Sequence, residues 1–177
     1  AGEVIERPAS VVKELVENSI DAGATNITVE IQNGGISKIR IIDNGSGMSK
    51  DDLEFAFERH ATSKIRKAAD LENVKSMGFR GEALASIAAI AHVELVSKTE
   101  DDNIGHKIVV EGGKILEIED SASQKGTTIT VSNLFFNTPV RYKFLKKDFT
   151  EAGYIEDAVT RIAIANPNIA IKLINGN

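Results

Sequence analysis

The stretch NITVEIQNGGISKIRII, residues 26–42, decides the class of fold that this chain can build. Residues 26–32 alternate between polar and apolar side chains, which is typical of a β-strand with one buried face. Asn33-Gly34-Gly35 is a turn sequence that favours a hairpin, and residues 36–42 return as a second strand. Strands joined by so short a turn pair antiparallel, so this stretch favours a sheet built from hairpins.

The rest of the chain combines helices with further strands. Pro8 suits the first turn of a helix and Gly23 suits its exit, so a helix is predicted over residues 8–22. Ser49 with Asp52 resembles a capping box and predicts a helix that runs to about residue 59. Residues 60–81 carry little periodicity and are predicted to form a long loop, of the kind that is usually functional or disordered. Further helices are predicted at 82–91, 140–147 and 149–165, and further strands at 93–99, 106–111, 114–119, 126–133 and 168–174.

This order of elements predicts an α+β fold. We expect a two-layer α/β sandwich in which helices cover one face of a mixed, mostly antiparallel sheet. The strand connections are mainly hairpins, which argues against a doubly wound parallel sheet. The 177 residues are enough to bury one core, so residues 1–177 are expected to form a single domain.

Composition and charge exclude several classes of protein. The chain is 42% hydrophobic and 27% charged, and no apolar run is long enough to span a membrane. Absence of cysteine excludes disulfides and thiolate metal sites, and no secretory signal opens the chain, so a reducing compartment such as the cytoplasm is expected. The net charge of −5 argues against a surface devoted to nucleic acid. Two local basic clusters are nevertheless present: Arg141, Lys143, Lys146 and Lys147, and Arg59, His60, Lys64, Arg66 and Lys67.

The first predicted helix carries a candidate site. Glu14, Asn18 and Asp21 fall on one arc of the helix, beside its apolar edge. A carboxylate one turn from a carboxamide could combine a general base with a hard oxygen ligand for Mg²⁺. On this helix alone, a polar face of an ordinary amphipathic helix is the simpler interpretation.

Three glycine-containing stretches are further candidates. Residues 43–47, DNGSG, follow a strand, and their Asp43 could accept a hydrogen bond from an amino group, although DNG is also a common turn. Residues 78–84, GFRGEAL, could aim backbone N–H groups near Glu82 at an anion, or could be a plain helix entry. Residues 125–128, KGTT, read equally well as a turn before a strand. Neither a P-loop nor a GxGxxG turn is present in the sequence.

Six segments together resemble one family. In order, they are ELVENSIDAGA (14–24), DNGSGM (43–48), RHATSK (59–64), GFRGEALASI (78–87), GTT (126–128) and FFNTPVRYKFL (135–145). They are similar to the GHKL ATPases, which have the Bergerat fold of the gyrase, Hsp90 and histidine-kinase nucleotide sites, and within them to the DNA mismatch repair branch. The resemblance spans essentially the whole chain. GFRGEAL and the last segment are specific to that branch, whereas the helix with Asn18, the DNGSG motif and GTT are shared across the wider family.

The resemblance implies roles for the matching residues. Glu14 takes the role of general base for the attack of water on the γ-phosphate of ATP, and Asn18 the role of Mg²⁺ ligand. Asp43 is implied to accept from the adenine amino group, supported through water by Thr127, with Gly47 close to the nucleotide. The lid over the phosphates is implied to run from Gly78 to Leu84. Its implied contacts are Phe79, Gly81 and the main chain of Glu82, Ala83 and Leu84.

The resemblance also implies partners and, for a bacterial protein, a cytoplasmic location associated with the nucleoid. The full-length protein is expected to form a homodimer when ATP is bound, and to act with a mismatch sensor of the MutS type, a downstream nuclease or helicase, and DNA. The chain is expected to be a fragment, without the family's preceding segment and second domain. It is therefore expected to bind ATP weakly, to dimerise poorly and to hydrolyse slowly, with a mobile GFRGEAL segment.

Three other functions stay open from the sequence. One is a nucleotide-gated binding module in which hydrolysis is incidental. Another is direct DNA binding through the basic clusters, which the acidic net charge limits to a part of the surface. The third is a histidine kinase or chaperone of the same fold, although no phospho-acceptor region is present and GFRGEAL does not suit either class.

Overall fold

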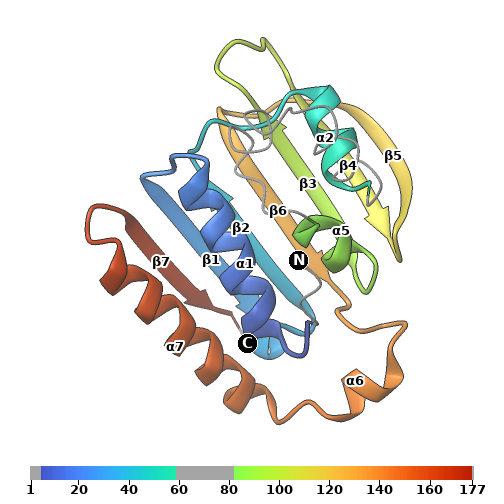
Figure 1. Cartoon of the computed structure of the whole chain (residues 1–177), viewed down its shortest axis with the longest axis vertical. Coiled ribbons are helices and arrows are strands. Elements are labelled where there is room, and N and C mark those ends of the chain that lie inside the picture. The colour runs from blue at the N-terminus through green and yellow to red at the C-terminus, as the bar shows by residue number, and fades with distance from the viewer. Residues whose placement is uncertain (1–4, 59–81, 177) are drawn as a thin grey trace.

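The computed structural model describes residues 5–58 and 82–176 and contains one seven-stranded sheet. Its strand order is β5-β4-β3-β6-β2-β1-β7 (Figure 1). The strands are β1 (Asn26–Gln32), β2 (Lys38–Asp43), β3 (His92–Lys98), β4 (Gly105–Glu111), β5 (Lys114–Ser121), β6 (Gly126–Ser132) and β7 (Ala170–Asn175). Neighbouring strands pair antiparallel, except that β7 runs parallel to β1. The sheet is therefore mixed and mostly antiparallel, as the hairpin pattern predicts.

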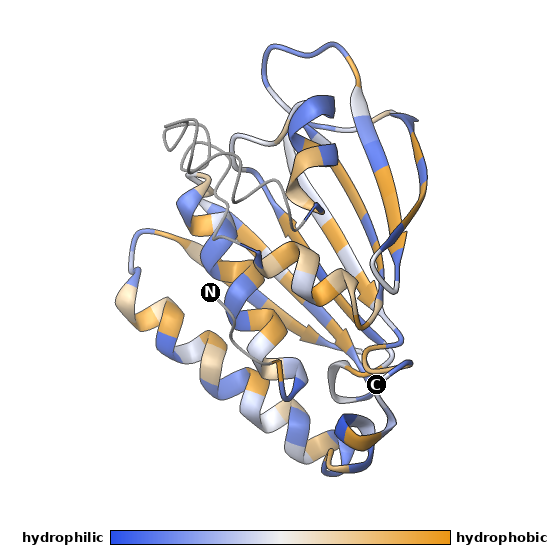
Figure 2. Cartoon of the chain, turned by 45° about the vertical axis from the view of Figure 1, so that its right-hand side comes forward, coloured by the Kyte–Doolittle hydropathy of each residue, from blue (hydrophilic) through white to orange (hydrophobic). Residues whose placement is uncertain are grey.

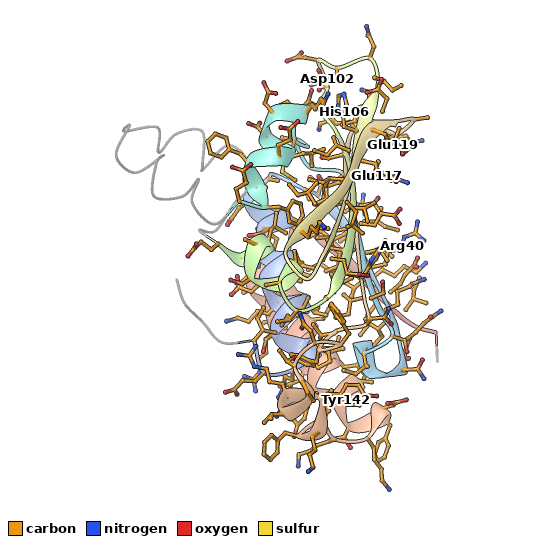
Figure 3. The ribbon with its side chains drawn as sticks, turned by 90° about the vertical axis from the view of Figure 1, so that its right-hand side faces the viewer. Arg40, Asp102, His106, Glu117, Glu119 and Tyr142 are labelled. Atoms are coloured by element: carbon orange, nitrogen blue, oxygen red, sulfur yellow. The ribbon has the colours of Figure 1, made fainter. Side chains whose placement is uncertain are left out.

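The helices lie on one face of this sheet. They are α1 (Pro8–Asp21), α2 (Lys50–Ala56), α5 (Ala83–Ala88), α6 (Pro139–Lys143) and α7 (Asp148–Ala165), with a 3₁₀ turn η1 (Asn33–Gly35) between β1 and β2. Seen along the edge of the sheet, the helices occupy one side, and Arg40 of β2 points to the other (Figure 3). The predicted two-layer α+β sandwich is confirmed.

The structure moves several predicted boundaries. Strand β2 begins at Lys38 rather than residue 36, because Asn33, Gly34 and Gly35 take positive φ and Ile36 stays in the helical region. Helix α2 ends at Ala56, before the predicted residue 59. Residues 59–81, which include the whole of the predicted loop, lie outside the described residues.

The ends of two other helices also differ from the prediction. Helix α5 ends at Ala88 rather than residue 91, where the N–H of Ile90 bonds three residues back to the carbonyl of Ile87. The carbonyl groups of Ala88 and Ala91 then accept from the N–H groups of Gly113 and Gly112 in the β4–β5 turn. Helix α6 ends at Lys143 rather than residue 147. The turn between β4 and β5 therefore satisfies carbonyl groups at the end of α5.

Alternation along the strands builds the core. The inward positions of β1, Ile27, Val29 and Ile31, are at most 1% exposed. Helix α1 faces them with an apolar stripe, and the same banding is visible along the sheet in Figure 2. Burying one such aliphatic side chain contributes roughly 1.5–3 kcal/mol. The inward stripe therefore fixes the register of each strand, since a shift of one residue would expose its whole apolar set. The main buried positions of the other elements are Val11, Val12, Leu15, Val16, Ile39, Ile41, Val93, Leu95, Ile108, Val110, Ile129 and Val131.

Helix α7 begins directly against the turn between β1 and β2. A Cβ atom at Gly34 would lie 2.7 Å from the carbonyl oxygen of Asp148, the first residue of α7. Asn33 donates from Nδ2 to Oδ2 of Asp148 at 3.2 Å. The turn sequence thus forms the hairpin and also leaves room for the first turn of α7.

A buried carboxylate joins α7 to the start of α1. Glu151 is 1% exposed, and its Oε2 accepts a hydrogen bond from the backbone N–H of Lys146 at 2.8 Å. Nη1 of Arg7, the residue before α1, lies 3.7 Å from Oε1 of Glu151, and the Arg7 guanidinium also packs over the ring of Tyr154. The two long helices are therefore held together at one end by a charged pair.

No helix within residues 5–58 and 82–176 has the length and apolar character needed to cross a bilayer.

We expect Gly34→Ala to destabilise the chain. Gly34 has φ of 65° and its new Cβ would meet Asp148, so about 2 kcal/mol or more should be lost from the free energy of unfolding. Gly153→Ala is the matched control, because Gly153 lies inside α7 with nothing within 4 Å of its Cβ position. That change should stabilise by about 0.5–1 kcal/mol. Urea unfolding checks both, and equal midpoints for the two variants would contradict this account of the turn.

Candidate functional site

A cavity lies between α1 and the sheet, bounded also by α5. It has a volume of about 40 Å³, which is room for about one or two water molecules. Apolar side chains form most of its wall, and the polar groups gather where α1 meets the ends of β2 and β6. Its lining residues are Leu15, Asn18, Ser19, Ala22, Asp43, Met48, Leu84, Leu95, Thr127 and Ile129.

Asp43 is the central polar group of this cavity. Its Oδ2 accepts from the hydroxyl of Ser19 at 2.6 Å, and its Oδ1 accepts from the backbone N–H groups of Gly45 at 2.9 Å and Thr127 at 3.2 Å. Burial raises the pKa of the Asp43 carboxyl above its usual value, and these three hydrogen bonds, with the charge of Lys125, lower it by less. The donors come from α1, the loop after β2, and β6, so three separate parts of the fold hold this carboxylate.

A row of residues across three neighbouring strands continues this network. Asp43 of β2 stands opposite Thr127 of β6, which in turn stands opposite Ser97 of β3. Ser97 is fully buried, and its Oγ lies 2.7 Å from Oγ1 of Thr127 and 3.1 Å from the carbonyl oxygen of Gly126. It also accepts from the backbone N–H of Met48 at 2.8 Å. The cavity floor is therefore a continuous polar network from α1 to β3.

Asn18 presents an unpaired oxygen. Its Oδ1 is buried and has no hydrogen-bond partner within residues 5–58 and 82–176, although the residue lines the cavity. Glu14 lies one turn earlier on α1 and does not line the cavity, and Asp21 is exposed at the end of the helix. A buried oxygen without a partner is destabilising unless a ligand or water satisfies it, so Asn18 is a candidate ligand residue.

Gly47 in the loop after β2 and Gly126 at the start of β6 both have a structural explanation. Gly47 has φ of 73°, and a Cβ there would overlap the carbonyl group of Lys98 on β3. Gly126 has φ of 123°, and a Cβ there would overlap the carbonyl group of Asp43. Gly47 does not line the cavity. Its requirement for glycine thus follows from close packing of the loop on β3, whether or not it contacts a nucleotide.

Of the GFRGEAL segment, the structure describes residues 82–84. Helix α5 starts at Ala83 with Glu82 at the N-cap position, which agrees with the predicted helix start. The side chain of Leu84 is buried and lines the cavity, whereas Glu82 and Ala83 do not line it. Phe79 and Gly81 lie outside the described residues.

Of the residues singled out from the sequence, the structure thus brings four to one cavity: Asn18, Asp43, Leu84 and Thr127. Sequence reasoning missed Ser19 and Ser97. The sequence does contain a signal for Ser97, because this residue follows Val93 and Leu95 at the alternate, inward positions of β3. A hydroxyl at a fully buried strand position needs partners, which marks it as part of a network.

A family model described as histidine kinase-, DNA gyrase B- and HSP90-like ATPase matches residues 5–133, nearly three quarters of the chain. The chain belongs to this family of ATPases. Within the family, its sequence and fold match the MutL branch, so the predicted resemblance to the mismatch repair branch is confirmed.

Two relatives and one solved structure illustrate the match. The chain is 59% identical over 174 residues to the DNA mismatch repair protein MutL of Caldanaerobacter subterraneus subsp. tengcongensis, and 58% identical over 177 residues to that of Agathobacter rectalis. These alignments cover 98% and 100% of the chain but 30% and 27% of the relatives. The Aquifex aeolicus MutL ATPase domain complexed with ADP superposes with a TM-score of 0.78 at 37% identity, covering 97% of this chain and 61% of that one.

We expect Asp43→Asn to change the pH dependence of stability. Because the folded-state pKa of Asp43 is raised, the native state binds more protons than the unfolded chain between the two pKa values, and stability falls as pH rises through that window. An amide can keep the same contacts, with Oδ1 accepting from the two N–H groups and Nδ2 donating to Ser19. Relative to Asp43→Asn, the wild type should therefore lose stability as the pH rises from the ordinary aspartate pKa of about 3.9 through the higher folded-state pKa.

Urea unfolding of both proteins at several pH values measures this difference. A wild type that gains stability over Asp43→Asn as the pH rises would contradict the assignment of desolvation as the dominant influence on Asp43.

Proposed function

We propose that the cavity is the adenine end of an ATP site and that this chain hydrolyses ATP. The observation that carries the proposal is the pair of acceptors at its floor, the Asp43 carboxylate and the Thr127 hydroxyl oxygen, side by side on β2 and β6. Such a pair is suited to receive the two protons of an exocyclic amino group. The ADP complex of the structurally similar Aquifex aeolicus domain supports a nucleotide as the ligand.

The apolar walls suit a flat purine ring. Leu15 comes from α1, Met48 from the loop after β2, and Leu84 from α5, while Leu95 and Ile129 belong to the sheet. Together these side chains give the apolar surface on which a purine ring would lose its contact with water.

Asn18 and Glu14 are the residues that we propose to act at the phosphates. The unpaired Oδ1 of Asn18 fits a hard cation such as Mg²⁺, which commonly takes one or two protein oxygens and completes its shell with phosphates and water. The described residues hold no group of three or more acidic or histidine side chains that could bind a metal without the nucleotide. When bound, the ion supplies charge neutralisation at the phosphates. Glu14, one turn along α1, is the proposed general base that orients the attacking water.

For the whole protein we propose an ATP-gated switch in DNA mismatch repair. ATP binding would favour a homodimer and hydrolysis would reset it, relaying recognition by a MutS-type mismatch sensor to a nuclease or helicase. The names of the relatives support this role. Weak binding and slow hydrolysis by the 177-residue chain remain predictions, as does a cytoplasmic location. The alternative is a nucleotide-gated binding module in which hydrolysis is incidental. A variant of Glu14 distinguishes this module from the ATP-gated switch.

A second candidate function is contact with single-stranded DNA through the segment around α6. Tyr142, Phe144 and Phe149 are 56%, 77% and 76% exposed. The exposed Lys143 and Lys147 lie between them in the sequence. Figure 3 labels Tyr142 in this segment. Exposed aromatic rings stack on bases while lysines contact phosphates, which is the usual pattern of single-strand binding. The segment leads into the start of α7, at the opposite end of the sheet from the loop after β2 (Figure 1). This contact would therefore be separate from the nucleotide site.

We expect Glu14→Ala to separate hydrolysis from binding. Loss of the base should lower the rate of hydrolysis by roughly 10²–10⁴-fold, because positioning and activation of water are removed, while ATP affinity changes little. Glu17→Ala is the matched control, since Glu17 lies on the side of α1 that faces α7. Phosphate release with protein in excess over ATP, together with a binding titration, measures both. Unchanged hydrolysis in Glu14→Ala would contradict the proposed role, and intact repair by a full-length Glu14→Ala protein would favour the binding-module alternative.

Replacement of Lys143 and Lys147 by Gln should weaken single-stranded DNA binding and flatten its salt dependence. Each lost phosphate contact should reduce the slope of log affinity against log salt by about 0.7. Lys172→Gln on β7 is the control, because it removes an exposed charge far from α6. Fluorescence anisotropy across salt concentrations measures the slope. An equal effect of Lys172→Gln would point to nonspecific charge attraction and contradict a site at α6.

A further inference from the structure

Ser97 makes three contacts at once from a fully buried position. Its Oγ is 2.8 Å from the backbone nitrogen of Met48, 3.1 Å from the carbonyl oxygen of Gly126 and 2.7 Å from Oγ1 of Thr127. A hydroxyl group has one proton to donate and two lone pairs that accept. The identities of the three neighbours therefore limit which way each hydrogen bond runs.

One arrangement makes all three contacts hydrogen bonds. The Met48 N–H can only donate, so it takes one lone pair of Ser97, and the Gly126 carbonyl can only accept, so it takes the Ser97 proton. Ser97 then has one lone pair left for Thr127, whose hydroxyl must donate to it. With its proton directed to Ser97, Thr127 offers only lone pairs to the cavity that it lines.

We propose that Ser97 is a positioning residue that sets the polarity of the base-recognition site, by holding the Thr127 hydroxyl as an acceptor beside the Asp43 carboxylate. This rests on the proposed function, in which the cavity takes a purine base. An acceptor-only floor favours a 6-amino purine and disfavours a 6-oxo purine, whose carbonyl oxygen would face two further acceptors. Ser97 itself does not line the cavity and acts through Thr127.

A purely structural role is the competing explanation, because Ser97 also joins three segments. Its partners belong to the loop after β2 and to β6, while Ser97 itself lies in β3. Loss of those links alone would lower stability and weaken all purine nucleotides by a similar factor. A change in the preference between two bases that differ at position 6 is not expected from such a loss. The preference ratio therefore distinguishes the two roles.

The test compares ATP with inosine triphosphate, which carries a carbonyl oxygen in place of the amino group at position 6 and a proton on the neighbouring ring nitrogen. Binding of both is measured by equilibrium titration with Mg²⁺, for the wild-type chain and Ser97→Ala, at a temperature where both are folded. In Ser97→Ala the Thr127 hydroxyl is free to rotate and to donate to the inosine oxygen. We expect the ratio of ATP to inosine triphosphate affinity to fall about fivefold, the effect of one neutral hydrogen bond.

Two further variants complete the design. Thr127→Val removes the hydroxyl that Ser97 is proposed to orient, so adding Ser97→Ala to it should leave the ratio unchanged. Thr128→Val is the control, since Thr128 is the next residue on β6 and does not line the cavity. It should keep the wild-type ratio.

The outcomes separate this inference from the proposed function. A wild type that prefers ATP, with the same ratio in Ser97→Ala, overturns the positioning role and leaves the ATP site standing. A wild type that binds neither nucleotide overturns both. A ratio that falls in Ser97→Ala and does not fall further in the Thr127→Val background supports the inference.

Discussion

The burial of the Asp43 carboxylate is the constraint on which the rest of the structure depends. A charge in this position needs several donors, and it receives them from Ser19 on α1, Gly45 in the loop after β2, and Thr127 on β6. Those three contacts are made together only when α1 is seated on the sheet and β2 and β6 are paired in the observed register. The same packing excludes any side chain at Gly126, whose Cβ would overlap the backbone of Asp43. The hydrophobic core and the polar site therefore specify one arrangement.

The same constraint makes the site unfavourable for stability and favourable for recognition. Burial raises the pKa of Asp43, so keeping it ionised near neutral pH reduces the stability of the fold. The Oδ1 atom of Asn18 is a further buried polar atom and, unlike the Asp43 carboxylate, it has no partner among the described residues. Binding sites are commonly places where stability is reduced in this way, because a ligand satisfies the groups that the empty protein leaves unpaired. A ligand with an amino group and a bound cation would satisfy both at once.

Much of the fold could be predicted from local sequence. The alternation of residues 26–32 and the turn Asn33-Gly34-Gly35 gave the antiparallel pair, and Pro8 and Gly23 bracketed α1 to within a residue. The parallel pairing of β7 with β1 could not be predicted in this way, since it depends on how α7 packs across the sheet. Local periodicity contains no information on that packing.

The site was only partly predictable for a similar reason. The motifs marked Asn18, Asp43 and Thr127, and the family resemblance connected them, because each alone was equally consistent with a turn or a polar helix face. The direction of a hydroxyl proton depends on the partners that the sheet register brings together. Ser97 is 30 residues from Thr127 in sequence, and its role emerges only once β3 lies beside β6. Residues 59–81, including Phe79 of GFRGEAL, lie outside the described structure, so their implied contacts with phosphates stay predictions.

The most direct test of the central claim is a calorimetric titration with a non-hydrolysable ATP analogue, with and without Mg²⁺. The account predicts that the wild-type chain binds and that Asp43→Asn, which keeps its fold, loses most of that binding because an amide nitrogen would face the adenine amino group. It also predicts that Asn18→Ala binds the analogue with little response to Mg²⁺. Equal binding by the wild type and Asp43→Asn would contradict the claim that this cavity recognises adenine.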